Sequence, residues 1–246
     1  MSQDKSEKSG KTPIALEAYE KIAEGFSERA PSKAENAYIE QPAMRNAVGN
    51  VRGLKIFEAG CGPGILAEYL VHEGAKVVAF DVSPKMIELA KKRVPDNATF
   101  FVADMAHALP IDQNGQFDMV VASLSIDYVE SWTIPLNEFH RLLKPKGKFI
   151  FTIQHPIGSW NWYKPTSAFG VQYVEASWKG FTDEPVTMPD YYRSFSEIVN
   201  PLITAGFKIL KVEDLKPIDA LRTLDPYKFG KYSKLATFMC VIVEKE

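Results

Sequence analysis

The residues with the clearest chemical potential form the stretch Glu-Ala-Gly-Cys-Gly-Pro-Gly at positions 58–64. It follows a short apolar run at 54–59 and leads into a segment with helical periodicity at 64–73. Glycines let the backbone turn sharply and approach a ligand closely, and the first N–H groups of the following helix would point into the same crevice. The stretch therefore predicts a ligand site at the carboxyl end of a buried strand.

Acidic residues also follow the next two predicted strands. Asp81 comes directly after the apolar run 76–80, and Asp104 comes directly after the run 99–103. Because the carboxyl ends of parallel strands meet at one edge of a sheet, we expect Glu58, Asp81 and Asp104 to face one crevice. A carboxylate at 81 can accept hydrogen bonds from both hydroxyls of a ribose, and one at 104 can accept from an adenine amino group. A lone Asp at a strand end is more often a turn or cap residue, but three acids with a glycine loop favour a nucleotide site.

The spacing of the glycines separates two kinds of nucleotide site. A dinucleotide-binding loop needs a third glycine at position 65, where this chain has Ile65. The glycines at 60, 62 and 64, with the acid before them, instead resemble motif I of class I S-adenosylmethionine-dependent methyltransferases. The run 117–123 resembles the fourth strand of that family, and 142–147 resembles the turn into its fifth strand, with Lys146 where the family commonly has glycine.

Segments on either side of this core extend the resemblance. The stretches 19–26, 36–42 and 151–156 resemble a bacterial subgroup with small-molecule substrates, and the similarity to the core covers about residues 36–155. The resemblance implies S-adenosylmethionine as cofactor. The residues expected to bind it are Tyr19, Tyr38, Glu58, Gly60, Cys61, Gly62, Gly64, Asp81, Val82, Met86, Asp104, Met105, Ser123 and Leu124.

The resemblance also limits what catalysis requires. Methyl transfer from a sulfonium is an in-line displacement with a neutral leaving group, so holding donor and nucleophile in line supplies much of the rate. A general base is needed only if the nucleophile carries a proton of high pKa. The candidate catalytic residues follow the fourth and fifth strands and are Asp127, Tyr128 and His155. Many relatives have His at the place of Asp127, so this chain departs from the family there.

Other potentially reactive residues favour structural interpretations. His155 itself could instead bond a loop backbone, and both alternatives stay open. His72, His107 and His140 lie in predicted helices or a loop without a partner pattern. Cys61 lies inside the glycine loop, where the family often has Cys without using it as a nucleophile. No Cys/His cluster has the spacing of a zinc site, so we expect no metal.

The elements that must position these residues alternate between strand and helix. Apolar runs and helical segments take turns along the core, which predicts a parallel sheet covered on both faces. Two later runs, 207–213 and 235–243, are expected to pair antiparallel at one edge. We therefore predict an α/β fold, a doubly wound, mostly parallel, seven-stranded Rossmann-like sheet with an antiparallel edge strand. The predicted parts are a disordered tail at 1–12, an N-terminal helical cap at 13–50, the cofactor-binding core at 51–155, an insertion at 156–192 and the C-terminal completion of the sheet at 193–246.

The insertion at 156–192 is unusual in composition. It holds three of the four tryptophans and carries two Lys residues against four acidic ones. An acidic, aromatic segment does not favour nucleic acid. It fits a substrate lid, in which large rings exclude water from a pocket. The alternative is a small aromatic core that stabilises only the insertion.

Composition excludes several other classes of protein. The 246 residues are 46% hydrophobic and 24% charged, with a formal net charge of −2, which argues against a general electrostatic grip on nucleic acid or anionic membranes. Two cysteines rule out a disulfide scaffold, and no apolar run approaches the ~18 residues of a membrane span. The polar start lacks the apolar core of a signal peptide, so we expect a cytoplasmic protein. The stretch 125–128 lacks the prolines of nucleic-acid amino methyltransferases.

These observations lead to one function and two alternatives. We expect an S-adenosylmethionine-dependent methyltransferase that acts on a small-molecule acceptor, aromatic or apolar, mainly through proximity and orientation. We expect no nucleic-acid or membrane partner. The alternatives are a module that binds or senses S-adenosylmethionine without turnover, and a methyltransferase that acts on a macromolecule.

Overall fold

Residues 12–246 are described by the computed structural model, so the tail predicted at 1–12 lies outside the described residues apart from Thr12. A seven-stranded sheet with the strand order β3-β2-β1-β4-β5-β9-β8 forms the centre of the fold. The strands are β1 (Lys55–Ala59), β2 (Lys76–Asp81), β3 (Ala98–Val102), β4 (Phe117–Ser123), β5 (Leu143–Gln154), β8 (Phe207–Asp214) and β9 (Phe238–Lys245).

The direction of the strands confirms the predicted fold class. Strands β1 to β5 pair parallel with their neighbours, whereas β9 pairs antiparallel with both β5 and β8. The connections run toward β3 on one side of β1 and toward β5 on the other, and open α/β sheets bind ligands at such a switch point. Strand β5 begins within the stretch 142–147 that resembles the family's turn into the fifth strand, because Leu143 already pairs with Phe117.

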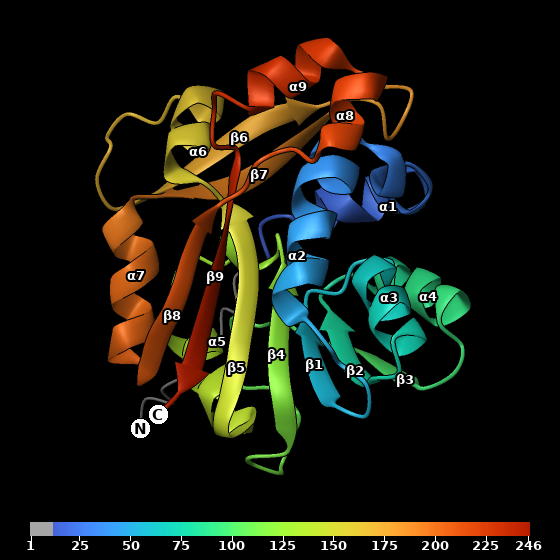
Figure 1. Ribbon diagram of the computed structural model, residues 1–246, viewed down its shortest axis with the longest axis vertical. Coiled ribbons are helices and arrows are strands. Elements are labelled where there is room, and N and C mark those ends of the chain that lie inside the picture. Colours follow the sequence, from blue (N-terminus) through green and yellow to red (C-terminus); the bar gives the residue numbers. More distant parts are fainter. Residues whose placement is uncertain (1–11) are drawn as a thin grey trace, which may run out of the picture.

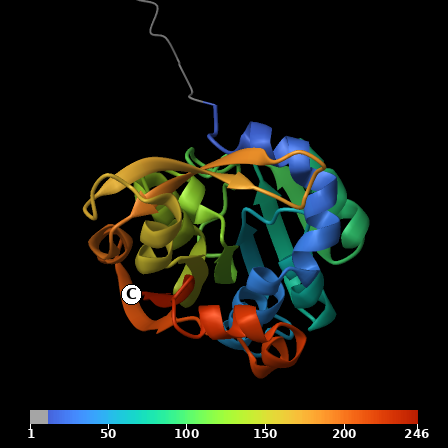
Figure 2. The ribbon, with the colours of Figure 1, turned by 90° about the horizontal axis from the view of Figure 1, so that it is seen from above.

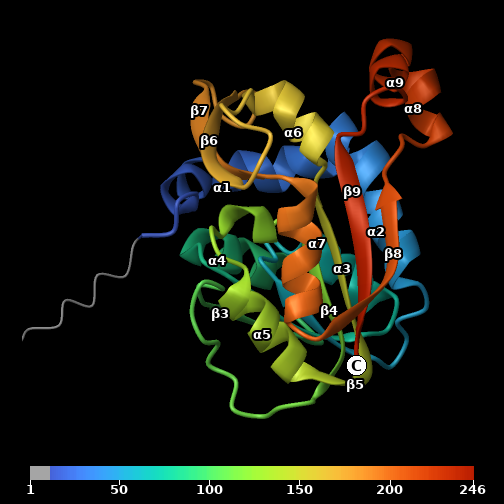
Figure 3. The same cartoon turned by 90° about the vertical axis from the view of Figure 1, so that its left-hand side faces the viewer.

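Helices cover both faces of the sheet (Figure 1, Figure 3). Successive side chains of a strand point to opposite faces, so Ile56 of β1 packs in one core with Leu70 while Phe57 packs in the other with Phe139. All four side chains are fully buried, and each such burial contributes about 1.5–3 kcal/mol to folding. The first face carries α2 (Gln41–Val48), α3 (Ile65–His72) and α4 (Pro84–Arg93), and the second carries α5 (Thr133–Leu142) and α7 (Phe195–Thr204).

The remaining elements gather around the carboxyl ends of the parallel strands (Figure 2). They are α1 (Leu16–Arg29), the π-helical turn η2 (Asn36–Glu40), α6 (Pro156–Tyr163), the hairpin of β6 (Val171–Trp178) and β7 (Val186–Arg193), α8 (Asp219–Leu224) and α9 (Pro226–Tyr232). Helix α1 lies in the segment 13–50 expected to form a helical cap, and the insertion at 156–192 consists of α6 and the hairpin. Helices α8 and α9 occupy a segment between the last two strands for which the sequence predicted no element.

Apolar and polar contacts fix α1 over the end of the sheet. Ile22 of α1 packs with Phe181 and Met188 of the hairpin region. On the other side of the helix, the carboxylate of Glu20 accepts a hydrogen bond from Lys85 N at 3.2 Å, at the start of α4. Helix α1 therefore bridges the insertion and the sheet core. No helix within residues 12–246 has the length and apolar character needed to cross a membrane.

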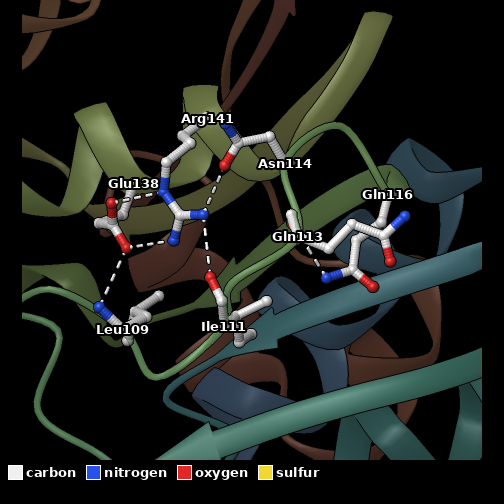
Figure 4. A network of polar contacts seen from close by, with 7 residues as sticks. All are labelled: Leu109, Ile111, Gln113, Asn114, Gln116, Glu138 and Arg141. Carbon is white, nitrogen blue, oxygen red and sulfur yellow. Dashed lines mark hydrogen bonds and ion pairs between the residues drawn. The ribbon is translucent and has the colours of Figure 1, made fainter.

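A polar network on α5 anchors the long connection between β3 and β4 (Figure 4). Arg141 donates to both carboxylate oxygens of Glu138 at 2.8 and 2.7 Å, and to Ile111 O and Asn114 Oδ1 at 2.9 and 2.8 Å. Glu138 also accepts from Leu109 N at 3.0 Å. The bidentate geometry ties this connection to the helix, and so fixes the path of the chain between Asp104 and the start of β4.

Candidate active site

A cavity of about 1020 Å³ lies at the carboxyl end of the sheet, between the glycine loop and the covering elements. Its floor comes from the ends of β1, β2 and β4, and its walls include side chains of α1, α6 and the hairpin region. Apolar area predominates in the lining, which also includes ten Asp, Glu, Lys and Arg residues. A concave site of this size and character is typical of enzymes with a small-molecule cofactor.

The glycine loop forms one wall of the cavity. A Cβ atom on Gly60 would lie 2.4 Å from the Cβ of Ser125, so no larger residue fits there. Gly62 has φ +52° and no atom within 4 Å of its Cβ position, and it faces the cavity. Both positions have a positive φ that other residues adopt only with strain. The loop thus offers bare backbone to a ligand at position 62.

The carboxylate of Asp81 lies against this loop. Its Oδ2 accepts from Gly62 N and its Oδ1 accepts from Ser83 N, both at 2.9 Å. Burial raises the pKa of Asp81, although these backbone N–H groups act in the opposite direction. Ser83 caps α4 by accepting from Met86 N at 3.1 Å. The end of β2 therefore holds a fixed, partly desolvated acceptor at the cavity wall.

Glu58 is the least satisfied polar residue of the site. It is 2% exposed, and its Oε2 has no hydrogen-bond partner among the described residues. Burial, with the nearby charges of Asp81 and Glu40, raises the pKa of Glu58 to about 8. A buried oxygen without a donor costs free energy unless a ligand supplies the donor.

Glu40 is a cavity residue that the sequence did not single out. Its Oε1 accepts from Ser123 Oγ and from Thr152 Oγ1, both at 2.7 Å, and burial raises its pKa. It lies in the segment 36–42 that resembles the bacterial subgroup, but nothing in the sequence separated it from its neighbours.

The structure brings most of the predicted cofactor residues together around the cavity. Asp104 lies in the wall with its Oδ1 accepting from Ala106 N at 2.8 Å. Cys61 is buried, and burial raises the pKa of its thiol well above the ordinary value, which disfavours a nucleophilic thiolate. The predicted residues that line the cavity are Tyr19, Glu58, Gly60, Cys61, Gly62, Asp81, Val82, Met86, Asp104, Met105, Ser123 and Leu124.

Two predicted cofactor residues lie elsewhere. Tyr38 borders a separate surface pocket with Tyr69 and Arg93. Gly64 precedes α3, and its Cβ position is 3.1 Å from Ala90 of α4, so this glycine serves close helix packing. Neither belongs to the lining of the cavity.

His155, the third candidate catalytic residue, is not among the residues that line the cavity. Its Nδ1 accepts from Ile157 N at 3.0 Å and thereby caps α6, while its Nε2 lies 3.1 Å from Asp214 Oδ1. Both ring nitrogens are occupied by these contacts. The structural interpretation of His155 is therefore the one that the geometry favours.

Asp127 and Tyr128, the other two candidate catalytic residues, line the cavity. The hydroxyls of Tyr128 and Tyr19 are 2.8 Å apart, so a predicted catalytic residue and a predicted cofactor residue meet across the site. Asp127 is 3% exposed. Burial and the neighbouring charge of Asp190 raise its pKa well above the ordinary value. Among residues 12–246, no group of three or more His, Cys, Asp or Glu is arranged to hold a metal ion.

Comparisons with known proteins agree with this geometry. A family model described as a methyltransferase domain matches residues 57–151. An uncharacterized protein of Haemophilus influenzae is 30% identical over 217 residues, which are 81% of this chain and 82% of that protein. The magnesium-protoporphyrin O-methyltransferase of Rhodobacter capsulatus is 41% identical over 113 residues, which are 42% of this chain and 46% of that enzyme. The chain thus matches about half the length of this relative with an assigned reaction.

A solved structure extends the similarity to the whole fold. The crystal structure of an S-adenosylmethionine-dependent methyltransferase from Mesorhizobium loti superposes with a TM-score of 0.69 at 26% identity, covering 88% of this chain and 100% of that one. The strand order, the glycine loop with its acids and these similarities together establish that the chain belongs to the class I S-adenosylmethionine-dependent methyltransferases, with S-adenosylmethionine as its cofactor.

Proposed function

We propose that the enzyme transfers a methyl group to a small molecule held between the glycine loop and the covering elements. The observation that carries this proposal is one continuous cavity, which runs from Gly62 and Asp81 to Trp162 and Trp178. Its volume of about 1020 Å³ lies at the upper end of the range for small-molecule pockets, about 300–1,000 Å³. Relatives whose names specify magnesium-protoporphyrin or ubiquinone biosynthesis support a small acceptor.

The residues of the wall fit the cofactor. Asp81 would accept from the ribose hydroxyls, and Asp104 would accept from the adenine amino group. The unpartnered Oε2 of Glu58 would accept from the ammonium of the methionine part. Gly62 leaves open space at its Cβ position for close approach of a ligand. S-adenosylmethionine supplies a methyl group on a sulfonium, and its departure leaves a neutral thioether.

The protein's own contribution is alignment and exclusion of water. Helix α1, α6 and the hairpin carry aromatic side chains into the cavity wall, including Tyr19, Trp162 and Trp178. Large rings around the reacting atoms keep water away from the methyl group and hold the acceptor in line. We propose that these elements act as a cover, which is the lid interpretation of the insertion.

A labelled-donor assay tests this function. The protein is incubated with a metabolite extract and methyl-labelled S-adenosylmethionine, and labelled compounds are identified by mass spectrometry. A labelled compound of low mass that disappears with Asp81→Ala supports the proposal. Label in protein or nucleic acid would instead favour a macromolecule methyltransferase, and tight cofactor binding without any labelled product would favour a sensing module.

A further inference from the structure

A second group of buried polar residues, distinct from those assigned to the cofactor, lines or backs the cavity on the side of the insertion. It consists of Asp127 next to Tyr128, Gln154 at the end of β5, Tyr163 of α6, and Asp190 and Arg193 of β7. Asp127, Gln154 and Tyr163 line the cavity, whereas Asp190 and Arg193 lie behind them.

Asp127 has an unused oxygen in the cavity wall. Within residues 12–246 it accepts one hydrogen bond, from Gln154 N to Oδ2 at 3.2 Å, and its Oδ1 accepts none. The side chain is 3% exposed. A carboxylate oxygen without a hydrogen bond, on a residue that lines a cavity, can accept from a donor that a ligand provides.

Both carboxylate oxygens of Asp190, the acid behind Asp127, accept hydrogen bonds. Its Oδ2 accepts from Tyr163 Oη at 2.9 Å and from Gln154 Nε2 at 2.5 Å, and its Oδ1 accepts from Tyr191 N at 2.7 Å. Gln154 therefore links the two carboxylates through its backbone and its side chain. The insertion thus supplies a second carboxylate, Asp190, which fixes Gln154 and Tyr163 beside Asp127.

The group is short of positive charge. Arg193 is the cation that faces Asp127 and Asp190, but its Nη2 is used by the carbonyl oxygens of Val129 and Glu130. The other titratable groups facing Asp127 are the phenols of Tyr19, from α1, and Tyr163, from α6. When both carboxyls are ionised, they exceed the one guanidinium by one negative charge, and a cation in the cavity would neutralise it.

The wall around Asp127 is aromatic. Tyr19 packs edge-on against Tyr128 with ring centroids 5.4 Å apart, and against Trp178 at 6.2 Å. Trp162 and Tyr163 line the same cavity. Aromatic faces beside a carboxylate attract a cation through their quadrupoles and exclude water from it.

We propose that the methyl acceptor is an amine whose ammonium group binds Asp127 within this aromatic wall. The proposal rests on the proposed function, because it assigns the acceptor side of the same cavity. The ammonium gives one proton to Asp127, and the freed nitrogen lone pair forms the new N–C bond. The S–C bond breaks with its electron pair remaining on sulfur, and the product leaves as a methylated ammonium.

Ligand binding by calorimetry tests the proposal without the natural acceptor. The protein is saturated with S-adenosylhomocysteine and titrated with benzylammonium or, as the neutral analogue, benzyl alcohol. We expect benzylammonium to bind at least about tenfold more tightly than benzyl alcohol, and Asp127→Asn to remove that difference. The matched control, Asp183→Asn, changes an exposed acid of the insertion and should leave both affinities unchanged.

The pH dependence gives a second measurement that needs no variant. The pKa of Asp190 is raised to about 6 and that of Asp127 is raised as well, so protonated carboxyls should compete with the ammonium at low pH. Affinity for benzylammonium should therefore rise with pH as these carboxyls ionise, with proton release on binding.

The outcomes separate the two proposals. Failure to bind S-adenosylhomocysteine would remove the cofactor assignment and the proposed function with it. If S-adenosylhomocysteine binds normally, three results would overturn the amine inference alone. They are equal affinity for both probes, no binding of benzylammonium, and a preference for benzylammonium that Asp127→Asn leaves unchanged.

Discussion

Replacing Glu58 by Gln should stabilise the ligand-free protein at neutral pH while weakening cofactor binding. Burial raises the pKa of Glu58 to about 8 from an ordinary value of 4.5. The folded state therefore holds a proton that the unfolded state releases above pH 4.5, so the free energy of unfolding falls as pH rises from 4.5 to 8. Gln has the same shape as Glu and carries no charge in the folded or the unfolded state, so the free energy of unfolding no longer falls with pH at this position.

The magnitude follows from the same shift. At pH 7 the pH is about 2.5 units above the pKa of this carboxyl in the unfolded chain. At about 1.36 kcal/mol per unit, the free energy of unfolding is lower by about 3 kcal/mol. Relaxation around the buried group reduces this value, so we expect Glu58→Gln to stabilise the protein by about 1–3 kcal/mol at pH 7 and by much less near pH 4.5. For a chain of this length each kcal/mol raises Tm by about 2–4 °C.

Urea unfolding followed by tryptophan fluorescence at several pH values measures this effect. Glu88→Gln, an exposed position of α4, is the control for loss of one surface charge. Calorimetry with S-adenosylhomocysteine should show weaker binding to Glu58→Gln, because the amide replaces a carboxyl that can ionise when the ammonium of the ligand binds. A variant with wild-type stability at pH 7 and an unchanged dependence on pH would refute the reasoning.

Four further expectations concern the site and its cover. Asp81→Ala should lose about 1.5–3 kcal/mol of S-adenosylhomocysteine affinity for each charged hydrogen bond removed, and unchanged affinity by calorimetry would remove Asp81 from the ribose site. Gly62→Val should abolish binding while circular dichroism stays native, because a branched side chain would fill the open space of the loop. His155→Ala should lower Tm through loss of the α6 cap, a cost of about 0.5–2 kcal/mol, without changing cofactor affinity. Hydrogen exchange in 13–38 and 156–192 should slow when S-adenosylhomocysteine is added, whereas slowing confined to the loop and strand ends would make the cover merely structural.

The core of the fold could be predicted because its determinants are local. The loop at 58–64 carries its glycines and acid within a few residues, and the alternation of apolar runs with capped helices is visible along the chain. Each acid comes at the end of a parallel strand, so it lies at the edge of the sheet where the carboxyl ends of these strands meet. For these reasons Asp81 and Asp104 were placed at the cavity wall from sequence alone.

The outer parts of the site depend on contacts that sequence patterns do not contain. Tyr38 and Glu40 share the π-helical turn η2, and the wider turn changes which side chain points inward. His155 became a cap because α6 starts directly after it and Asp214 of β8 lies beside it. Asp190 is separated from Asp127 by more than sixty positions and joins it only through the packing of the hairpin. Helices α8 and α9 are too short to produce a clear helical periodicity.

The acids in and behind the cavity wall share one property, which favours the binding of cationic ligands. Burial raises the pKa of Glu40, Glu58, Asp81, Asp127 and Asp190, so each carboxyl is less stable in its charged form than it would be in water. A cationic ligand recovers part of that cost, and its affinity increases accordingly. S-adenosylmethionine carries an ammonium and a sulfonium, whereas its product keeps only the ammonium, so the donor gains more from these acids than the product does. With an amine acceptor that has given one proton to Asp127, the positive charge moves from sulfur to nitrogen during transfer, beside the aromatic rings that attract a cation.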